Sequence, residues 1–182
     1  MQKKTVNTIK KFVAFFYVYA FLGWVIDVSV VFFSDGVLTN RGFLFEPICP
    51  MYGYAALVLI VIADSIKQKG FVGLVKKTIL ATIWCSVLEY ITAWILDIFF
   101  HQMWWDYSKE PFNLQGRICL LASLFWGVLS VIFMTVLHPF VVKVLKKISS
   151  KISPKVINVM LCVAVGITFV DTIISIVRYI IH

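Results

Sequence analysis

The sequence predicts an all-α, polytopic membrane protein with about five transmembrane helices. Hydrophobic residues make up 61% of the 182-residue chain, charged residues make up 14%, and the mean hydropathy is +0.94. Soluble domains are only about half apolar and about a quarter charged. The apolar residues also form long continuous runs without the two-residue alternation of a transmembrane β-barrel, so we expect helices.

Five apolar runs are candidates for membrane spans. The hydrocarbon core of a bilayer is about 30 Å thick and a helix rises about 1.5 Å per residue, so a span needs about 20 mainly apolar residues. We expect the runs to form one integral membrane domain over residues 1–182. They cover residues 12–33, 47–63, 78–100, 118–140 and 156–180.

The first two runs differ in how they begin. The run that follows "MQKKTVNTIKK" is too long for a secretory signal and has no small-x-small cleavage site after it, so it is expected to be a membrane anchor. The second run lies in "NRGFLFEPICPMYGYAA", residues 40–56, whose two prolines should break or delay the helix. Non-helical backbone at membrane depth must be buried in protein or line a wet cavity.

The loop before the fourth span contains "WWDYSKEPFNLQGR", residues 104–117. Its aromatic residues, Trp105 among them, fit a belt at the membrane interface. That role does not explain Asp106, Asn113 and Arg117, which we expect to serve a binding site.

Four carboxylates fall inside the predicted spans. They are Asp27, Glu89, Asp97 and Asp171. A charged side chain at mid-bilayer costs about 2.5 to 3.5 kcal/mol on insertion scales, so these groups should face the bundle interior and find partners. They either serve a functional site, which we favour for Glu89 and Asp27, or only join helices by hydrogen bonds. For Asp171 both interpretations remain open.

The basic residues predict the orientation. Thirteen lysines gather at the N-terminus, around residues 67–77 and around residues 143–155, which the positive-inside rule places in the cytoplasm. Five spans then put the C-terminus outside, together with Arg41, Arg117 and Arg178. The net charge of +8 therefore indicates topology and contact with anionic lipid, and no nucleic-acid motif accompanies it.

The two halves of the chain follow a similar plan, which suggests a tandem two-helix repeat with an added fifth helix. Each half has a helix with an acid, a loop with an arginine next to a glycine, and a helix that begins near an aromatic-glycine pair. The corresponding features are Asp27, Arg41 and Tyr52-Gly53 in the first half, and Glu89, Arg117 and Trp126-Gly127 in the second.

Several stretches resemble the ABC-transporter type IV membrane component family, also called CmpB-like, which is bacterial. They are "FLGWVID", "NRGFLFEPICPMYG", "LEYITAWILD" and "WWDYSKEPFNLQGRICLLASLFWG", within about residues 10–140. The resemblance implies a permease-like role in a bacterial cell membrane. The sequence departs from the family pattern at Glu46, where a small residue is usual, and at Asp27, where Glu is common. The pattern is expected to end before the fifth helix.

Together these features lead us to expect an outward-facing, charged and aromatic pocket for a small polar solute or a lipid headgroup. The predicted binding residues are Asp27, Arg41, Glu89, Trp105, Asp106, Asn113 and Arg117. The chain has no GxxxxGK[ST] motif, so ATP-driven transport would require a separate cytoplasmic ATPase, and the small size suggests a partner or a homo-oligomer.

Two other functions stay open from the sequence. An outer-leaflet enzyme could use Asp106 and Glu89 as acid and base, although no catalytic constellation, metal-ligand set or cofactor motif is recognisable. A structural or regulatory subunit would use the same polar groups only for helix packing. We therefore do not expect an enzyme, a metal or a cofactor.

Overall fold

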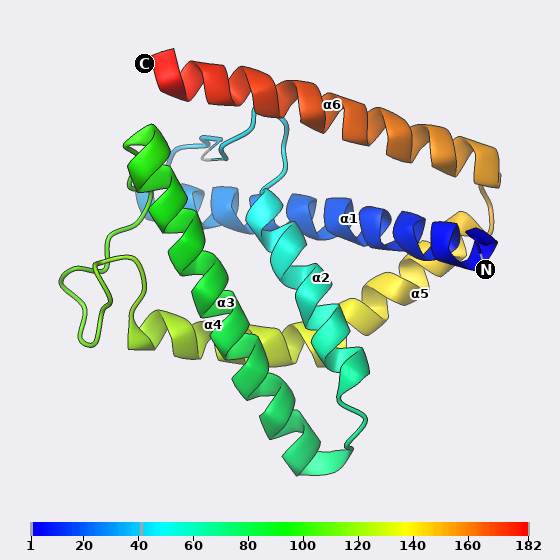
Figure 1. Ribbon diagram of the computed structural model, residues 1–182, viewed down its shortest axis with the longest axis horizontal. Coiled ribbons are helices and arrows are strands. Elements are labelled where there is room, and N and C mark those ends of the chain that lie inside the picture. Colours follow the sequence, from blue (N-terminus) through cyan, green and yellow to red (C-terminus); the bar gives the residue numbers. More distant parts are fainter. Residues whose placement is uncertain (1, 41, 182) are drawn as a thin grey trace. The chain divides into compact units, whose positions relative to one another are not determined.

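The computed structural model describes residues 2–40 and 42–181, and most of these residues are helical (Figure 1). The elements are α1 (Gln2–Asp35), α2 (Pro50–Ser65), α3 (Gly70–Phe100), α4 (Leu120–Ile132), the π-helical segment η1 (Phe133–Leu137), α5 (His138–Ser149) and α6 (Pro154–Ile181). The predicted all-α membrane fold is confirmed.

Four helical stretches are long and apolar enough to cross a membrane. They are Asn7–Phe33, Gly70–Phe100, Leu120–Ser149 and Pro154–Ile181. α2 is apolar but has only 16 residues. The observed set of four long helices and one shorter apolar helix agrees with the expected number of about five.

The helix ends differ from the ends of the apolar runs. α2 begins at Pro50, as expected from its prolines, because the first turn of a helix does not need the missing N–H. α3 begins at Gly70, well before the apolar run at residue 78, and includes Lys76 and Lys77. Lysine is a good helix former, so the backbone ladder continues into the polar region. An apolar run therefore predicts which part of a helix lies in the membrane, but it does not predict the residue at which the helix begins or ends.

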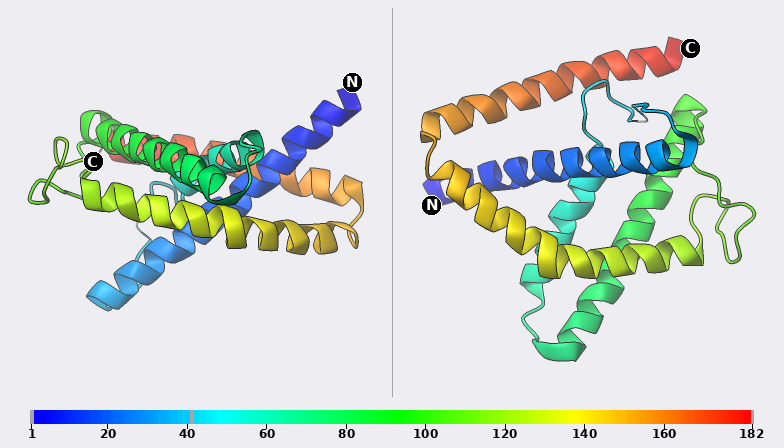
Figure 2. Two further views of the ribbon diagram at one scale, coloured as in Figure 1. Left: turned by 90° about the horizontal axis from the view of Figure 1, so that it is seen from below. Right: turned by 180° about the vertical axis from the view of Figure 1, so that it is seen from behind.

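The helix that follows the loop after α3 is interrupted by η1. The backbone N–H of His138 donates to the carbonyl of Phe133, five residues earlier. Pro139, which has no N–H and would clash with the preceding turn, follows at once. The helix axis changes direction where α4 passes into α5 (Figure 2). A π bulge beside a proline is an ordinary cause of such a bend.

The chain forms two compact units. Unit 1 comprises Met1–Leu57 and Lys146–His182, and unit 2 comprises Val58–Leu145. In unit 1, α1 and α6 cross (Figure 2). The hydroxyl groups of Tyr17 and Thr168, one from each helix, are 2.9 Å apart. The loop before α2 packs Leu44 and Ile48 against Ala20 of α1, and these three residues form a buried apolar cluster.

Unit 2 is built on the packing of α3 against α4. Small and polar residues lie between the two helices. Ser86 donates a hydrogen bond to Ser123 over 2.8 Å, and a Cβ added at Gly127 would lie 2.5 Å from the hydroxyl of Thr82. In a membrane the hydrophobic effect does not bring helices together, so helix association depends on close packing, which small residues allow. Gly127 is therefore required by the tight α3–α4 contact.

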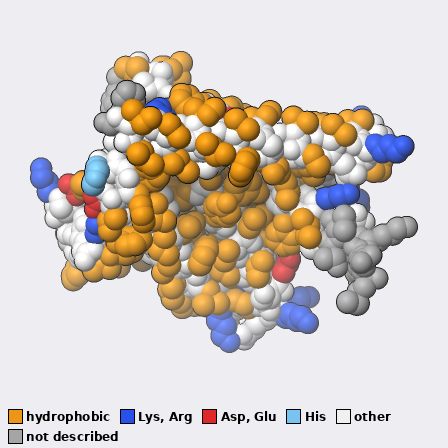
Figure 3. All heavy atoms as spheres, turned by 45° about the horizontal axis from the view of Figure 1, so that its top comes forward, with side chains coloured by type: hydrophobic (Ala, Val, Ile, Leu, Met, Phe, Trp, Pro, Cys, Tyr) orange, Lys and Arg blue, Asp and Glu red, His pale blue; other side chains and the backbone are white. Residues whose placement is uncertain are grey.

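The outer surfaces of the helices are apolar. Phe33, Phe71 and Phe169 expose 86%, 80% and 67% of their surface, and only 6% of the most apolar part of α6 is buried. Figure 3 shows that hydrophobic side chains cover much of the visible face, whereas Lys and Arg side chains lie at its margins. Side chains so arranged meet lipid rather than water, as expected of membrane spans.

Candidate functional site

The loop between α3 and α4, residues 101–119, is held by its own polar side chains. Both carboxylate oxygens of Asp106 accept hydrogen bonds from Ser108, one from its N–H at 2.8 Å and one from its hydroxyl at 3.0 Å. The Asn113 side chain donates to the carbonyls of Ser108 and Glu110 and accepts from the N–H of Gly116. These bonds give the loop a fixed path without regular structure.

The bonds from Ser108 also lower the pKa of Asp106. The backbone N–H contributes most, and the Ser108 hydroxyl adds to it, because both stabilise the ionised form. Asp106 is exposed. It therefore shapes the loop as a carboxylate at neutral pH.

Glu89 is the buried acid of unit 2, with 4% of its surface exposed. Its two carboxylate oxygens have different donors: Oε1 accepts from the Tyr107 hydroxyl at 3.1 Å, and Oε2 accepts from Trp126 Nε1 at 2.9 Å. Glu89 thus joins α3 to the loop through Tyr107 and to α4 through Trp126. Sequence reasoning did not identify Tyr107 as a partner, since it was assigned only to the interfacial belt.

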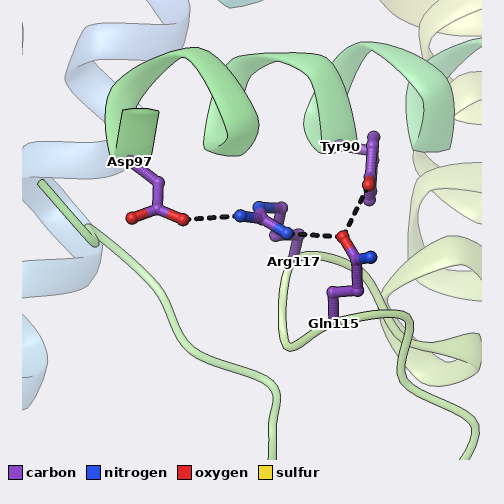
Figure 4. A network of polar contacts seen from close by, with 4 residues as sticks. All are labelled: Tyr90, Asp97, Gln115 and Arg117. Carbon is purple, nitrogen blue, oxygen red and sulfur yellow. Dashed lines mark hydrogen bonds and ion pairs between the residues drawn. The ribbon is translucent and has the colours of Figure 1, made fainter. Parts of the chain in front are cut away.

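Arg117 links the end of the same loop to α3 (Figure 4). Its Nη2 lies 2.5 Å from Asp97 Oδ2, and its Nη1 donates to Gln115 Oε1 at 2.6 Å. The Tyr90 hydroxyl donates to the same Gln115 oxygen at 2.7 Å. Arg117 thus pairs with an acid of a predicted span, and its guanidinium contacts two different side chains.

Trp105 fixes Arg117 from the other side. Its indole N–H donates to the Arg117 carbonyl at 2.9 Å. Arg117 Nε is buried and has no hydrogen-bond partner within the described part of the chain. A cavity of about 20 Å³ lies beside it, lined by Asp97, Trp105 and Arg117 among others. A volume of that size holds about one water molecule.

Unit 1 contains the other predicted acid of the site. Asp27 of α1 accepts a hydrogen bond from the Tyr52 hydroxyl at 2.6 Å. A Cβ added at Gly23, one turn before Asp27, would overlap the Tyr52 ring. Gly23 therefore makes room for the aromatic residue that reaches Asp27.

The neighbouring loop of unit 1 has an asparagine at its centre. Asn40 Oδ1 accepts from Trp24 Nε1 at 2.9 Å and from the Gly42 N–H at 3.1 Å. Its amide nitrogen donates to the Leu44 carbonyl at 3.1 Å. Arg41 lies outside the described residues, so its predicted role in binding stays a prediction.

The two halves of the chain share these contacts. Asp27 accepts from Tyr52 and Glu89 accepts from Trp126, and each of these aromatic residues directly precedes a glycine. In both loops an asparagine accepts the N–H of a following glycine at 3.1 Å. The hydrogen bonds are similar in kind, although the asparagine precedes its glycine by two residues in the first loop and by three in the second, and the two-helix repeat stays a prediction.

Asp171 of α6 anchors the loop between α1 and α2, and this contact was not predicted from the sequence. It is buried, with 8% of its surface exposed, and accepts from the N–H groups of Phe45 and Glu46 at 3.1 and 2.8 Å. Ser175, one turn further on α6, donates to Asp171 at 3.1 Å. The sequence signal was the position of Asp171 inside a predicted span, and its partners could not be predicted because backbone donors leave no trace in a sequence.

Arg178 completes this anchor. Its Nη2 donates to the Phe43 carbonyl at 2.9 Å, and its guanidinium lies 4.3 Å and 4.4 Å from the ring centres of Phe45 and Tyr179. An acid and an arginine of α6 thus hold the backbone of residues 43–46 by its N–H and carbonyl groups. This arginine contacts backbone and rings, whereas Arg117 contacts an acid.

The structure thus brings together part of the predicted site. Within unit 2, the α3–α4 loop joins the buried Glu89 with the polar loop residues predicted for binding, namely Trp105, Asp106, Asn113 and Arg117. Asp27 has its own partner within unit 1. In the described ranges, no group of three or more His, Cys, Asp or Glu side chains is placed to hold a metal ion.

Apolar helices with a polar, loop-covered carboxylate define an integral α-helical membrane protein. A family model described as "Putative ABC-transporter type IV" matches residues 14–176, and the chain belongs to this family. The match includes most of α6, so the expectation that the family pattern ends before the fifth helix was wrong. A search of curated proteins and a search of solved structures found no match to the chain.

Proposed function

We propose that the chain is the permease-like membrane component of an ATP-driven transporter. Its membership of an ABC-transporter-related family is the observation that carries this proposal. The absence of a GxxxxGK[ST] motif from the sequence supports a separate cytoplasmic ATPase as partner. The lysine-rich segments at the N-terminus, around residues 67–77 and around residues 143–155 would face that partner in a bacterial cell membrane, with the N-terminus inside and the C-terminus outside.

The α3–α4 loop is the proposed place of solute contact. It combines a buried carboxylate, Glu89, with an ion pair between Arg117 and Asp97 and with indole and phenol donors. Such a mixture suits a small polar or zwitterionic solute. The cavity of about 20 Å³ holds no more than water, so the solute enters only when the loop releases Arg117.

The partner is tested by purifying the tagged protein from its native host in mild detergent and identifying co-purifying proteins by mass spectrometry. A stoichiometric ATPase supports the proposal, and ATP-dependent uptake then becomes the assay. A clean homo-oligomer without an ATPase contradicts the ATP-driven role.

The site is tested with Arg117→Lys. Lysine keeps the charge but cannot contact Asp97 and Gln115 with two fixed nitrogens, so transport should fall by about tenfold while the folded yield stays unchanged. Lys109→Arg, in the exposed part of the same loop, is the matched control. Normal transport by the Arg117→Lys variant would contradict the role of the guanidinium.

A structural or regulatory subunit is the second candidate function. The observation that favours it is that both oxygens of Glu89 already have donors from the protein. In that case Glu89→Gln lowers stability and activity together. A transport site predicts a Glu89→Gln protein that is folded and inactive.

A further inference from the structure

An open groove runs along one face of α6 in unit 1. Its apolar wall consists of side chains three and four residues apart, which share one side of the helix: Val163, Gly166, Ile167, Val170 and Ile174. The four aliphatic side chains are each about half exposed, and a Cβ added at Gly166 would meet no atom within 4 Å. The groove has a volume of about 710 Å³, within the range of about 300 to 1,000 Å³ typical of ligand sites.

The loop between α1 and α2 contributes a charged residue, Glu46, to one end of this groove. Glu46 and Phe45 line it together with Asp171 of α6. The Asp171 carboxylate is satisfied by the N–H groups of Phe45 and Glu46 and by the Ser175 hydroxyl. Glu46 Oε1, by contrast, is buried from solvent and has no hydrogen-bond partner in the described part of the chain. A buried carboxylate oxygen without a donor is costly, which indicates that a donor is missing.

The nearby arginine does not supply that donor. Arg178 gives one nitrogen to the Phe43 carbonyl and stacks its guanidinium on the rings of Phe45 and Tyr179. Among the residues that the structure describes, the two carboxylates that line the groove thus have a single arginine, Arg178, in their neighbourhood. Charge complementarity calls for a cation that can also donate hydrogen bonds.

The dimensions of the groove match one leaflet of a bilayer. From Val163 to Ile174 the helix rises about 16 Å at about 1.5 Å per residue. Half of a hydrocarbon core of about 30 Å is close to this length. Asp171 lies about 26 Å along the helix from Pro154, so the acidic end of the groove lies in the C-terminal half of α6.

We propose that this groove binds a phospholipid whose headgroup carries a primary ammonium, with the ammonium on Glu46 and one acyl chain along the aliphatic face of α6. The primary ammonium offers up to three N–H donors to the carboxylate, whereas a quaternary ammonium offers none. A water-soluble cation would leave the aliphatic wall unfilled. This lipid site is independent of the solute site at the α3–α4 loop.

The test compares three lipids with identical acyl chains: phosphatidylethanolamine, phosphatidylcholine and phosphatidylglycerol. Each is titrated into the delipidated full-length protein, and bound lipid is counted by native mass spectrometry. We expect phosphatidylethanolamine to bind about tenfold more tightly than the other two, as one charge-assisted hydrogen bond provides. Glu46→Gln should abolish this preference.

Two further variants keep the result interpretable. Glu110→Gln, an exposed acid in unit 2, should retain the preference. Val170→Trp fills the groove without removing the carboxylate and should lower the binding of all three lipids. Equal binding of the three lipids to the wild type, or an unchanged preference in Glu46→Gln, overturns the proposal. A loss of oligomer mass in Glu46→Gln without a change in lipid preference also overturns it, because a protein helix would then occupy the groove.

Discussion

Asp171 in unit 1 and Glu89 in unit 2 are both buried acids of membrane helices, and each holds a loop. They differ in their donors. Asp171 receives two backbone N–H groups, from Phe45 and Glu46. Glu89 receives only side-chain donors, from Tyr107 and Trp126.

This difference in donors determines which side-chain substitutions each loop tolerates. A backbone N–H is present whatever the side chain, so the loop at Asp171 keeps its path when its side chains change. The loop at Glu89 depends on a particular phenol and a particular indole. We therefore expect the loop of unit 2 to be sensitive to single side-chain changes, and the loop of unit 1 to be sensitive chiefly at Asp171.

The largest effect is expected from Asp171→Leu. It leaves the buried N–H groups of Phe45 and Glu46 without an acceptor and should lower the free energy of unfolding by about 3 kcal/mol. Unfolding in mixed micelles with increasing sodium dodecyl sulfate measures this loss. Ser175→Ala removes a single hydrogen bond and should cost about 1 kcal/mol. Equal losses in the two variants would show that the backbone contacts are not the anchor.

An intermediate effect is expected from Gly23→Ala. The added methyl group overlaps the Tyr52 ring and displaces the hydroxyl from Asp27, so a loss of about 2 kcal/mol is expected. Gly166→Ala, on a helix of the same unit, is the control because open space surrounds that position. The same micelle titration compares them. If Gly23→Ala is as stable as Gly166→Ala, α1 and α2 are not in tight contact at Tyr52.

The smallest effect is expected from Tyr107→Phe, about 1 kcal/mol at neutral pH, because the variant lacks the donor to Glu89 Oε1. Burial, and then the nearby negative charge of Glu89, raise the pKa of Tyr107 above its ordinary value of about 10. The contribution of the neutral phenol is therefore fully present below about pH 10 and is lost as the pH rises through the raised pKa.

Unfolding curves between about pH 8 and pH 11 test this dependence. The stability difference between wild type and Tyr107→Phe should shrink as the pH increases. A difference that is constant over this range would mean that the phenol does not titrate in contact with Glu89.

The apolar composition was enough to predict the helices, because any backbone in lipid must satisfy its own hydrogen bonds. The prolines before α2 were enough to predict its late start at Pro50. The similar plan of the two halves was also visible, since each half has an acid and an aromatic-glycine pair, and in each half the acid accepts a hydrogen bond from that aromatic residue.

The partners of the acids could not be predicted in the same way. Asp171 is 126 residues from Phe45 in the chain, and its donors are backbone groups that every residue except proline possesses. The Gln115 side chain, which lies between Arg117 and Tyr90, belongs to a loop whose path is set by turns rather than by periodicity. Sequence patterns predict which side of a helix is polar, but not which distant group meets it.

The π segment η1 has a geometric consequence for the helix that contains it. Phe133 and Val141, both buried in unit 2, are eight positions apart, which in an uninterrupted α-helix would turn their side chains about 80° away from each other. The π turn takes up one extra residue and reduces this divergence to about 20°. The bulge thus works as a phase correction: deleting one residue within η1 would leave Val141 seven positions after Phe133 in a regular α-helix and would keep the divergence of their side chains at about 20°.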